Sequence, residues 1–129
     1  MLRNNTEREQ LYKQYKDIIR KEYWGGFECG DGWLPIISIV LKHLNQVGHE
    51  GFRVLQIKEK FGGLRIYTSY TDDRIDSIID AAEQEARKTC EDCGSRIDVS
   101  LGYRSPGKYW VATLCKSCRR KDDESRQTK

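Results

Sequence analysis

The sequence predicts an α+β fold in which three helices pack on a β-hairpin, followed by a C-terminal four-cysteine hairpin like that of a zinc ribbon. Apolar residues recur at helical spacing in three segments, and between the second and the third the period changes to two. Four cysteines then form two Cys-x-x-Cys pairs. We expect a helical domain with a β-hairpin over residues 1–89, a zinc ribbon over residues 90–120 and a disordered tail over residues 121–129.

The composition is that of a small protein with a charged surface. The chain has 129 residues, a mass of 15.1 kDa and 37% hydrophobic residues, which supports one compact domain with an appended metal module. No apolar run is long enough to span a membrane and no secretion signal opens the chain, so we expect a cytoplasmic protein without a membrane partner. The formal net charge of +3 is too small for a dedicated DNA-binding protein.

The first predicted helix spans residues 6–23. Leu11, Tyr15 and Ile18 recur at helical spacing along it, with charged residues on the other face. Thr6 is placed to cap its start. We expect this amphipathic helix to pack on its own domain rather than on a partner.

A loop rich in glycine and aromatic residues follows at residues 24–33. Its four glycines permit tight turns and its three aromatic rings can anchor it, which indicates a shaped loop. Cys29 and Asp31 have two interpretations. They either line a recognition or catalytic cleft, or they are a buried thiol and a helix cap, and the composition favours the second.

The central predicted helix spans residues 33–47 and is apolar on most sides, as expected of a core helix. After it, residues 52–59 and 64–69 alternate as strands of a hairpin whose turn is at residues 60–63. Phe61 in that turn is either tucked under the hairpin or exposed as an interaction knob. The alternation predicts four core residues on the inner face, namely Leu55, Ile57, Leu64 and Ile66.

The opposite face of this hairpin is the main candidate binding surface. It would carry Gln56, Lys58, Arg65 and Tyr67. Two cations, an amide and an aromatic ring on a rigid sheet can bind phosphate, a stacked base or an acidic protein surface. A merely solvated outer face is the alternative.

A third helix is predicted over residues 72–88, and almost no linker separates it from the first cysteine pair. The metal ligands are predicted to be Cys90, Cys93, Cys115 and Cys118, with strands at residues 96–103 and 108–114 between the pairs. A site with four protein ligands has no open position, so the Zn²⁺ would be structural. Disulfides or free thiols are the alternative, and the paired spacing with Cys29 left over favours zinc.

Three blocks of sequence resemble a family of small uncharacterised bacteriophage and prophage proteins with a C-terminal zinc ribbon. The blocks are residues 27–33, residues 56–67, and residues 89–94 together with 113–115. In that family the last zinc ligand is often a histidine, so Cys118 looks like an equivalent substitution. The resemblance implies an origin in phage or prophage DNA and action in the cytoplasm of a bacterial host. It implies no established activity and no catalytic residue.

From these observations we expect a zinc-stabilised binding protein, not an enzyme, that engages a host protein and could inhibit a bacterial defence protein or a nuclease. Its oligomeric state is not predicted. The expected contact residues are Lys58, Arg65 and Tyr67 on the sheet, and Tyr109 and Trp110 on the zinc hairpin.

The alternative function is a nucleic-acid-binding zinc ribbon with Tyr109 or Trp110 stacking on bases. Its phosphate contacts would be Arg96, Arg104, Lys108, Arg119 and Arg120. An enzyme built on the loop with Cys29 and Asp31 is a third, weaker alternative.

Overall fold

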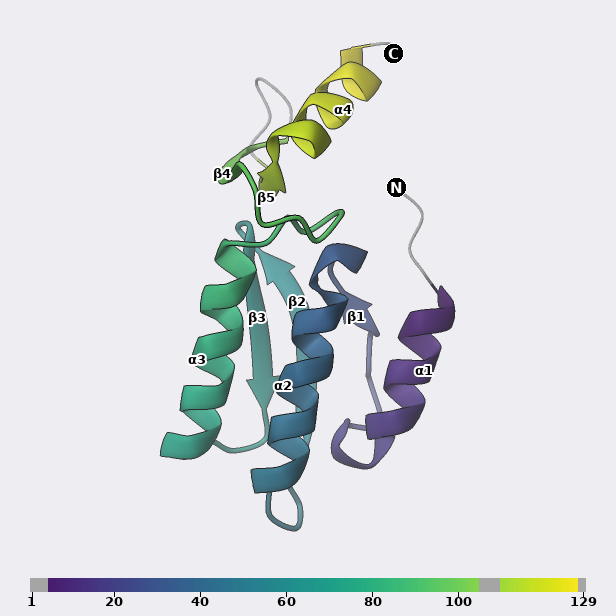
Figure 1. Cartoon of the computed structure of the whole chain (residues 1–129). Helices are drawn as coiled ribbons and strands as arrows, with labels where there is room; N and C mark the ends of the chain where they lie inside the picture. The colour runs from purple at the N-terminus through teal and green to yellow at the C-terminus, as the bar shows by residue number, and fades with distance from the viewer. Residues whose placement is uncertain (1–4, 105–109, 128–129) are drawn as a thin grey trace.

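Three helices lie on one face of a three-stranded sheet in the computed structural model, which describes residues 5–104 and 110–127 (Figure 1). Strand β2 (Val54–Lys60) is central, with β1 (Phe27–Glu28) parallel on one side and β3 (Gly63–Thr68) antiparallel on the other. The covering helices are α1 (Asn5–Tyr15), α2 (Leu34–Val47) and α3 (Asp73–Arg87). The mixture of helices and small sheets is as predicted, but the sheet has a third strand beyond the predicted hairpin.

The third strand was missed because it is only two residues long and lies inside the glycine-rich loop. Phe27 pairs with Ile57 and Glu28 with Lys58. Arg8 of α1 donates hydrogen bonds to the carbonyl oxygens of Phe27 and Cys29. The strand therefore depends on contacts with distant parts of the chain and has no periodicity of its own.

The first helix ends earlier than residues 6–23 predict. Helix α1 stops at Tyr15, and a short 3-10 turn, η1 (Lys16–Ile18), follows it. Ile19 is then extended, fully buried and bridged to Val54 in a parallel direction. The apolar spacing that suggested a longer helix instead brings Ile19 to the edge of the sheet, because burial against β2 outweighs local helix propensity.

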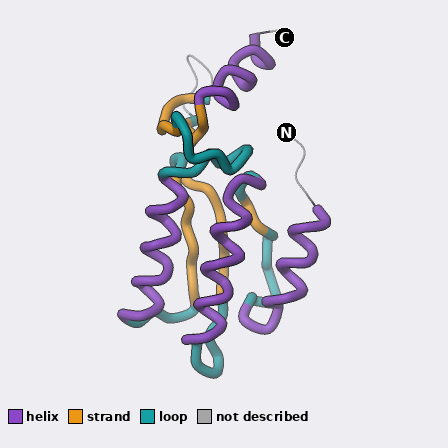
Figure 2. The backbone as a smooth tube through the Cα atoms, in the orientation of Figure 1, coloured by secondary structure: helices purple, strands orange, loops and turns teal. Residues whose placement is uncertain are grey.

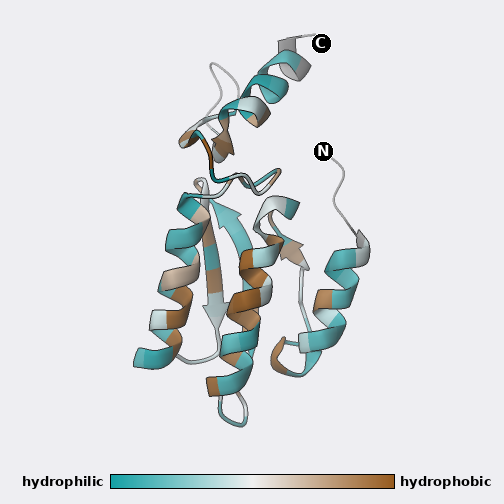
Figure 3. Ribbon diagram, in the orientation of Figure 1, coloured by the Kyte–Doolittle hydropathy of each residue, from teal (hydrophilic) through white to brown (hydrophobic). Residues whose placement is uncertain are grey.

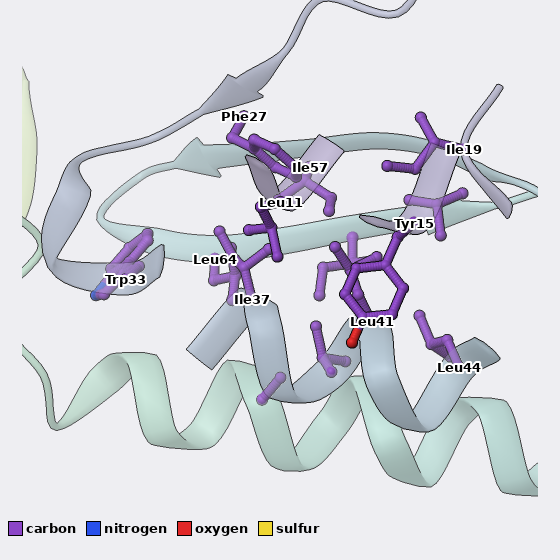
Figure 4. Packing of buried hydrophobic residues seen from close by; sticks show 14 of the residues in the cluster. Leu11, Tyr15, Ile19, Phe27, Trp33, Ile37, Leu41, Leu44, Ile57 and Leu64 are labelled. Atoms are coloured by element: carbon purple, nitrogen blue, oxygen red, sulfur yellow. The ribbon is translucent and has the colours of Figure 1, made fainter. Parts of the chain in front are cut away.

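The main core lies between the helices and the sheet (Figure 4). Helix α2 is the most apolar helix in Figure 3 and contributes Ile37, Leu41 and Leu44, none of which is exposed. Ile57 and Leu64 face them from the sheet. In the part of the chain that the structure describes, no helix covers the opposite face of the sheet.

One inner position of the hairpin differs from the predicted alternation. The pairing of β2 with β3 shifts between Val54 and Gln56. Val54 is fully buried, whereas Leu55 is only partly buried. Ile57, Leu64 and Ile66 are buried as predicted. The irregularity inserts one residue into β2 and so changes which neighbour enters the core.

The C-terminal unit contains strands β4 (Val99–Tyr103) and β5 (Val111–Cys115), which pair antiparallel, and helix α4 (Lys116–Gln127). The loop from α3 to β4, teal in Figure 2, crosses the end of the sheet before entering this unit. The predicted disordered tail over residues 121–129 is instead helical as far as Gln127. Figure 3 shows that α4 is mostly hydrophilic, so contacts with the hairpin rather than an apolar stripe account for it.

Candidate metal centre

The four predicted ligands converge at one point. The Sγ atoms of Cys90, Cys93, Cys115 and Cys118 all lie within 4.8 Å of one another. The Sγ atoms of Cys93 and Cys115 are 3.7 Å apart. None of the five cysteines forms a disulfide, and Cys93 alone among the four is exposed. The group can therefore hold a metal ion, with one edge near solvent.

A tight turn orients the thiols of the first pair, Cys90 and Cys93. Cys90 and Cys93 flank a turn in which the Gly94 amide donates to the Cys90 carbonyl oxygen at 2.9 Å. Gly94 has a φ of +83°, a conformation that a glycine adopts without strain. The Cys90 amide donates to the Ser95 carbonyl oxygen at 2.8 Å, which closes the turn. Two thiols three residues apart thus face the same side.

The second pair is carried by the end of a strand and the start of a helix. Cys115 ends β5 and Cys118 lies in the first turn of α4. The predicted hairpin between the two pairs is present as β4 and β5, and it brings the second pair to the first. The Cys118 amide donates a hydrogen bond to the Cys115 sulfur at 3.4 Å.

The thiols are in an environment that favours a cation. The amide of Cys118 lowers the pKa of Cys115 to about 7. Burial raises the pKa of Cys90 and of Cys118, so these two resist ionisation without a counter-charge. Buried thiolates this close together repel one another unless a metal ion neutralises them. The cluster therefore matches a metal site better than a set of independent thiols.

Two glycines allow the turn with Cys90 and Cys93 to pack directly on the main domain. A Cβ atom on Gly32 would lie 2.2 Å from the Cys90 carbonyl oxygen, and one on Gly30 would lie 2.4 Å from that of Glu91. The Gly32 amide donates to the Glu91 carbonyl oxygen at 2.7 Å. The Gly30 amide donates to the Glu91 carboxylate at 2.9 Å. No side chain larger than hydrogen fits at either glycine, so the cysteine turn packs its backbone directly against the glycine-rich loop.

A second contact joins the hairpin tip to the C-terminal unit. The Thr113 hydroxyl donates to the Gly62 carbonyl oxygen at 2.6 Å in a buried position. A Cβ atom on Gly62 would lie 2.3 Å from Cδ1 of Leu101. The β2–β3 turn therefore packs against β4 and β5, and the metal centre is attached to the main domain at two separate places.

A buried carboxylate lies at the centre of the junction. Glu91 is 5% exposed, and burial raises the pKa of its carboxyl group while the Gly30 amide lowers it. Its Oε1 lies 3.9 Å from the guanidinium of Arg104, which is also 3.4 Å from Asp92 and 3.7 Å from Asp122 of α4. This one cation links the cysteine turn to α4.

The loop with Cys29 and Asp31 is structural in its observed contacts. The Cys29 side chain is 1% exposed, so it does not line an open cleft. The Asp31 carboxylate accepts hydrogen bonds from Arg8 at 3.0 and 3.1 Å. Asp31 opens the 3-10 turn η2 (Asp31–Trp33) that precedes α2. Cys29 is therefore a buried thiol, as the second interpretation predicts. The predicted helix cap is wrong, because the N-cap residues of η2 and α2 are Gly30 and Trp33, and the Asp31 carboxylate binds Arg8 instead.

The predicted sheet-face residues do come together. Lys58 and Arg65 are directly paired across β2 and β3, and Gln56 is paired with Tyr67. Tyr67 is 41% exposed, and Lys58 and Arg65 are partly exposed. The inner residues Ile57 and Ile66 alternate with them, so the set lies on the face away from the helices.

The two predicted aromatic contacts on the zinc hairpin have different outcomes. Tyr109 lies outside the described residues. Trp110 is 55% exposed, and its ring lies 5.1 Å from the guanidinium carbon of Arg104. Trp110 thus has one face engaged within the molecule and covers the ionic contacts of the junction.

Most of the predicted phosphate contacts are engaged within the protein. Arg96 pairs with Glu85 at 2.7 Å, and Arg104 with three carboxylates as above. Arg119 donates to the carbonyl oxygens of Ser100, Tyr103 and Ala112. Lys108 lies outside the described residues, and Arg120 lines a groove between β4 and α4. Sequence reasoning missed these structural roles because they depend on distant partners.

No protein-family model, curated protein or solved structure matches the chain. Among the described residues, no helix is both long enough and apolar enough to cross a membrane.

Proposed function

We propose that this chain is a zinc-stabilised binding protein of phage or prophage origin that engages a host protein through the open face of its sheet. A bacterial defence protein or a nuclease is the proposed kind of target. The observation that carries the binding proposal is the pairing of Lys58 with Arg65, beside Tyr67. These residues lie on the sheet face that no helix within the described residues covers.

Zinc is the proposed metal because the donor set and spacing suit it. Four thiolates at Zn–S distances near 2.3 Å form a tetrahedron whose sulfur atoms are about 3.8 Å apart. The 3.7 Å between the sulfurs of Cys93 and Cys115 agrees with that spacing. With four protein ligands, the ion would supply folding energy and no catalytic position.

A protein target is favoured over a nucleic acid by the state of the cations. Arg96, Arg104 and Arg119 already have partners in the protein. To bind a phosphate backbone, and so release its counterions, each would have to give up those bonds. The sheet face offers two adjacent cations and an aromatic ring. This small, rigid and partly apolar set fits an acidic patch on a folded protein.

An affinity pull-down of the tagged protein from bacterial lysate, with and without nuclease treatment, tests the proposal. We expect one protein partner that survives nuclease. The purified partner is then titrated against the double charge reversal Lys58→Glu with Arg65→Glu, which should weaken binding at least tenfold by replacing attraction with repulsion.

The matched control is the double reversal Lys42→Glu with Arg74→Glu. Both residues are exposed on the helical layer, so the net charge changes equally while the sheet face is intact. Equal loss of binding in both double variants would show that only overall charge matters. Loss of every partner on nuclease treatment would replace the proposal with the nucleic-acid alternative.

A further inference from the structure

Phe61 is in a conformation and an exposure that the fold alone does not explain. It occupies the first position of the two-residue turn between Lys60 and Gly63, with a φ of +53°, followed by Gly62 at +81°. Positive φ at both positions defines a turn type that favours Asn-Gly, because a large L-residue is strained there. The Phe61 side chain is also 73% exposed, so its burial does not offset the strain.

One exposed apolar side chain lies beside this turn, and a second lies on the same strand. Leu101 of β4 contacts the Gly62 position through Cδ1 and is still 63% exposed. Tyr103, two residues further on the same strand, is 57% exposed and lies on the same face as Leu101. Phe61, Leu101 and Tyr103 together form what we call the tip patch. It spans the joint between the main sheet and the metal-binding hairpin.

Two cations border the tip patch, together with the Glu59 carboxylate, which accepts a hydrogen bond of 2.7 Å from the Gly62 amide. The Lys60 ammonium is 5.7 Å from the centroid of the Phe61 ring. The guanidinium of Arg65 lies over the backbone of Gly63, because a Cβ atom there would be 2.8 Å from its Nη1. An apolar centre with positive charge beside it is complementary to a segment that presents an apolar side chain between carboxylates.

We propose that the tip patch binds an acidic protein segment, with one of its apolar side chains held between Phe61 and Leu101 and its carboxylates beside Lys60 and Arg65. This deepens the proposed binding function, on which it rests, but uses residues outside the sheet face apart from Arg65. A nucleic acid that stacks its bases on Phe61 and Tyr103 is the competing occupant, and the oligonucleotide competition below distinguishes it.

The variant Phe61→Asn separates a binding role of Phe61 from a structural one. Phe61→Asn places the residue that this turn favours at a positive φ, so it should raise the thermal midpoint of unfolding while it removes the binding side chain. A residue whose role was purely structural would not lower binding when its replacement stabilises the fold. Leu101→Ser removes the second apolar wall at an exposed position.

The test selects ligands for the zinc-loaded full chain from a random dodecapeptide display library. The selected peptides are synthesised with a fluorescent label and titrated by anisotropy. We expect sequences that combine Asp or Glu with an aromatic or aliphatic residue, and at least tenfold weaker binding to Phe61→Asn and to Leu101→Ser. Ile39→Ser is the control, because Ile39 is 59% exposed on α2, away from the patch, and should change the affinity less than twofold.

Unchanged affinity for both patch variants would overturn the proposal, as would peptides without carboxylates. Displacement of the peptides by a dT20 oligonucleotide in the nanomolar range would replace the acidic segment with a nucleic acid. Lys58 belongs to the sheet face alone, so Lys58→Glu separates the two proposals. If Lys58→Glu retained the pull-down partner while Phe61→Asn lost it, the sheet-face proposal would fail and the tip patch would stand. The opposite result would reverse that conclusion.

Discussion

The indole Nε1–H of Trp33 donates a hydrogen bond of 2.9 Å to the carbonyl oxygen of Thr89, across 56 positions of sequence. Trp33 is fully buried where α2 begins, and Thr89 directly precedes Cys90, the first residue of the cysteine cluster. A buried indole that lost this acceptor would leave its N–H unsatisfied. The cysteine cluster and the main core are therefore expected to be energetically coupled.

Metal content provides the first prediction. The purified chain should carry one Zn²⁺, measured by elemental analysis, and Cys93→Ser should reduce the metal affinity at least a hundredfold because a thiolate ligand is lost. Cys29→Ala is the matched control, since it removes a buried thiol outside the cluster and should leave the stoichiometry at one. One tightly bound zinc in Cys93→Ser would exclude the proposed ligand set.

Removal of the metal should change the environment of Trp33 in the main core. In a chain carrying Trp24→Phe and Trp110→Phe, Trp33 is the sole tryptophan and its emission reports the junction. Chelation should shift this emission to longer wavelength, because release of the cysteine turn exposes the indole to water. Re-addition of Zn²⁺ should reverse the shift. An emission maximum that ignores chelation would mean that the two parts fold independently.

The close approach at the junction predicts a large cost for adding one methyl group. Gly32→Ala should destabilise the protein by about 2–3 kcal/mol in urea unfolding, because the new Cβ would overlap backbone atoms that cannot easily move. Gly25→Ala is the control. The three atoms nearest to its Cβ would all belong to the flexible carboxylate of Glu28, so the expected change is within about 0.5 kcal/mol. Similar costs at both positions would contradict the docking geometry.

A carboxyl group on α3 predicts a pH effect. Burial raises the pKa of Glu83 above its value in the unfolded chain, while Arg65 lowers it. Between the pKa of the unfolded chain and the higher pKa of the folded chain, the folded state binds the proton more tightly. The free energy of unfolding therefore rises as the pH falls from neutral through this range, and the contribution of Glu83 is lost at neutral pH.

Glu83→Gln should therefore raise the free energy of unfolding at pH 7 and lose this advantage near pH 4. The difference should stay below about 1 kcal/mol, because the side chain is half-exposed and solvent screens it. Urea unfolding of both proteins at the two pH values measures it. A destabilising substitution at pH 7 would mean that attraction to Arg65 outweighs burial.

The sequence predicted those features whose signal is local. The two Cys-x-x-Cys pairs, the apolar helix α2 and the alternating strands β2 and β3 each show their pattern within a few residues, and each is present in the structure. The predicted end of the first helix was wrong because Ile19 is buried against Val54, a partner 35 positions away. The helical character of residues 121–127 was missed because α4 is held by distant groups such as Arg104.

Three segments that are far apart in the sequence meet in space. Residues 27–33 contact the first cysteine turn within residues 89–94, and the turn within residues 56–67 contacts Thr113. From the sequence alone, the glycines of these segments indicated only tight turns. In the structure, Gly30 and Gly32 are places where two backbones touch.

The sequence by itself determined which residues can bind the metal and which face of the hairpin is polar, because spacing and alternation are properties of neighbouring residues. Only the tertiary structure decided that the cysteine turn docks on Gly32, that Arg104 and Arg119 bind within the protein, and that Phe61 is exposed beside Leu101. Each of these features is a contact between segments far apart in the chain. Such contacts form only when the core has set the relative positions of its helices and strands.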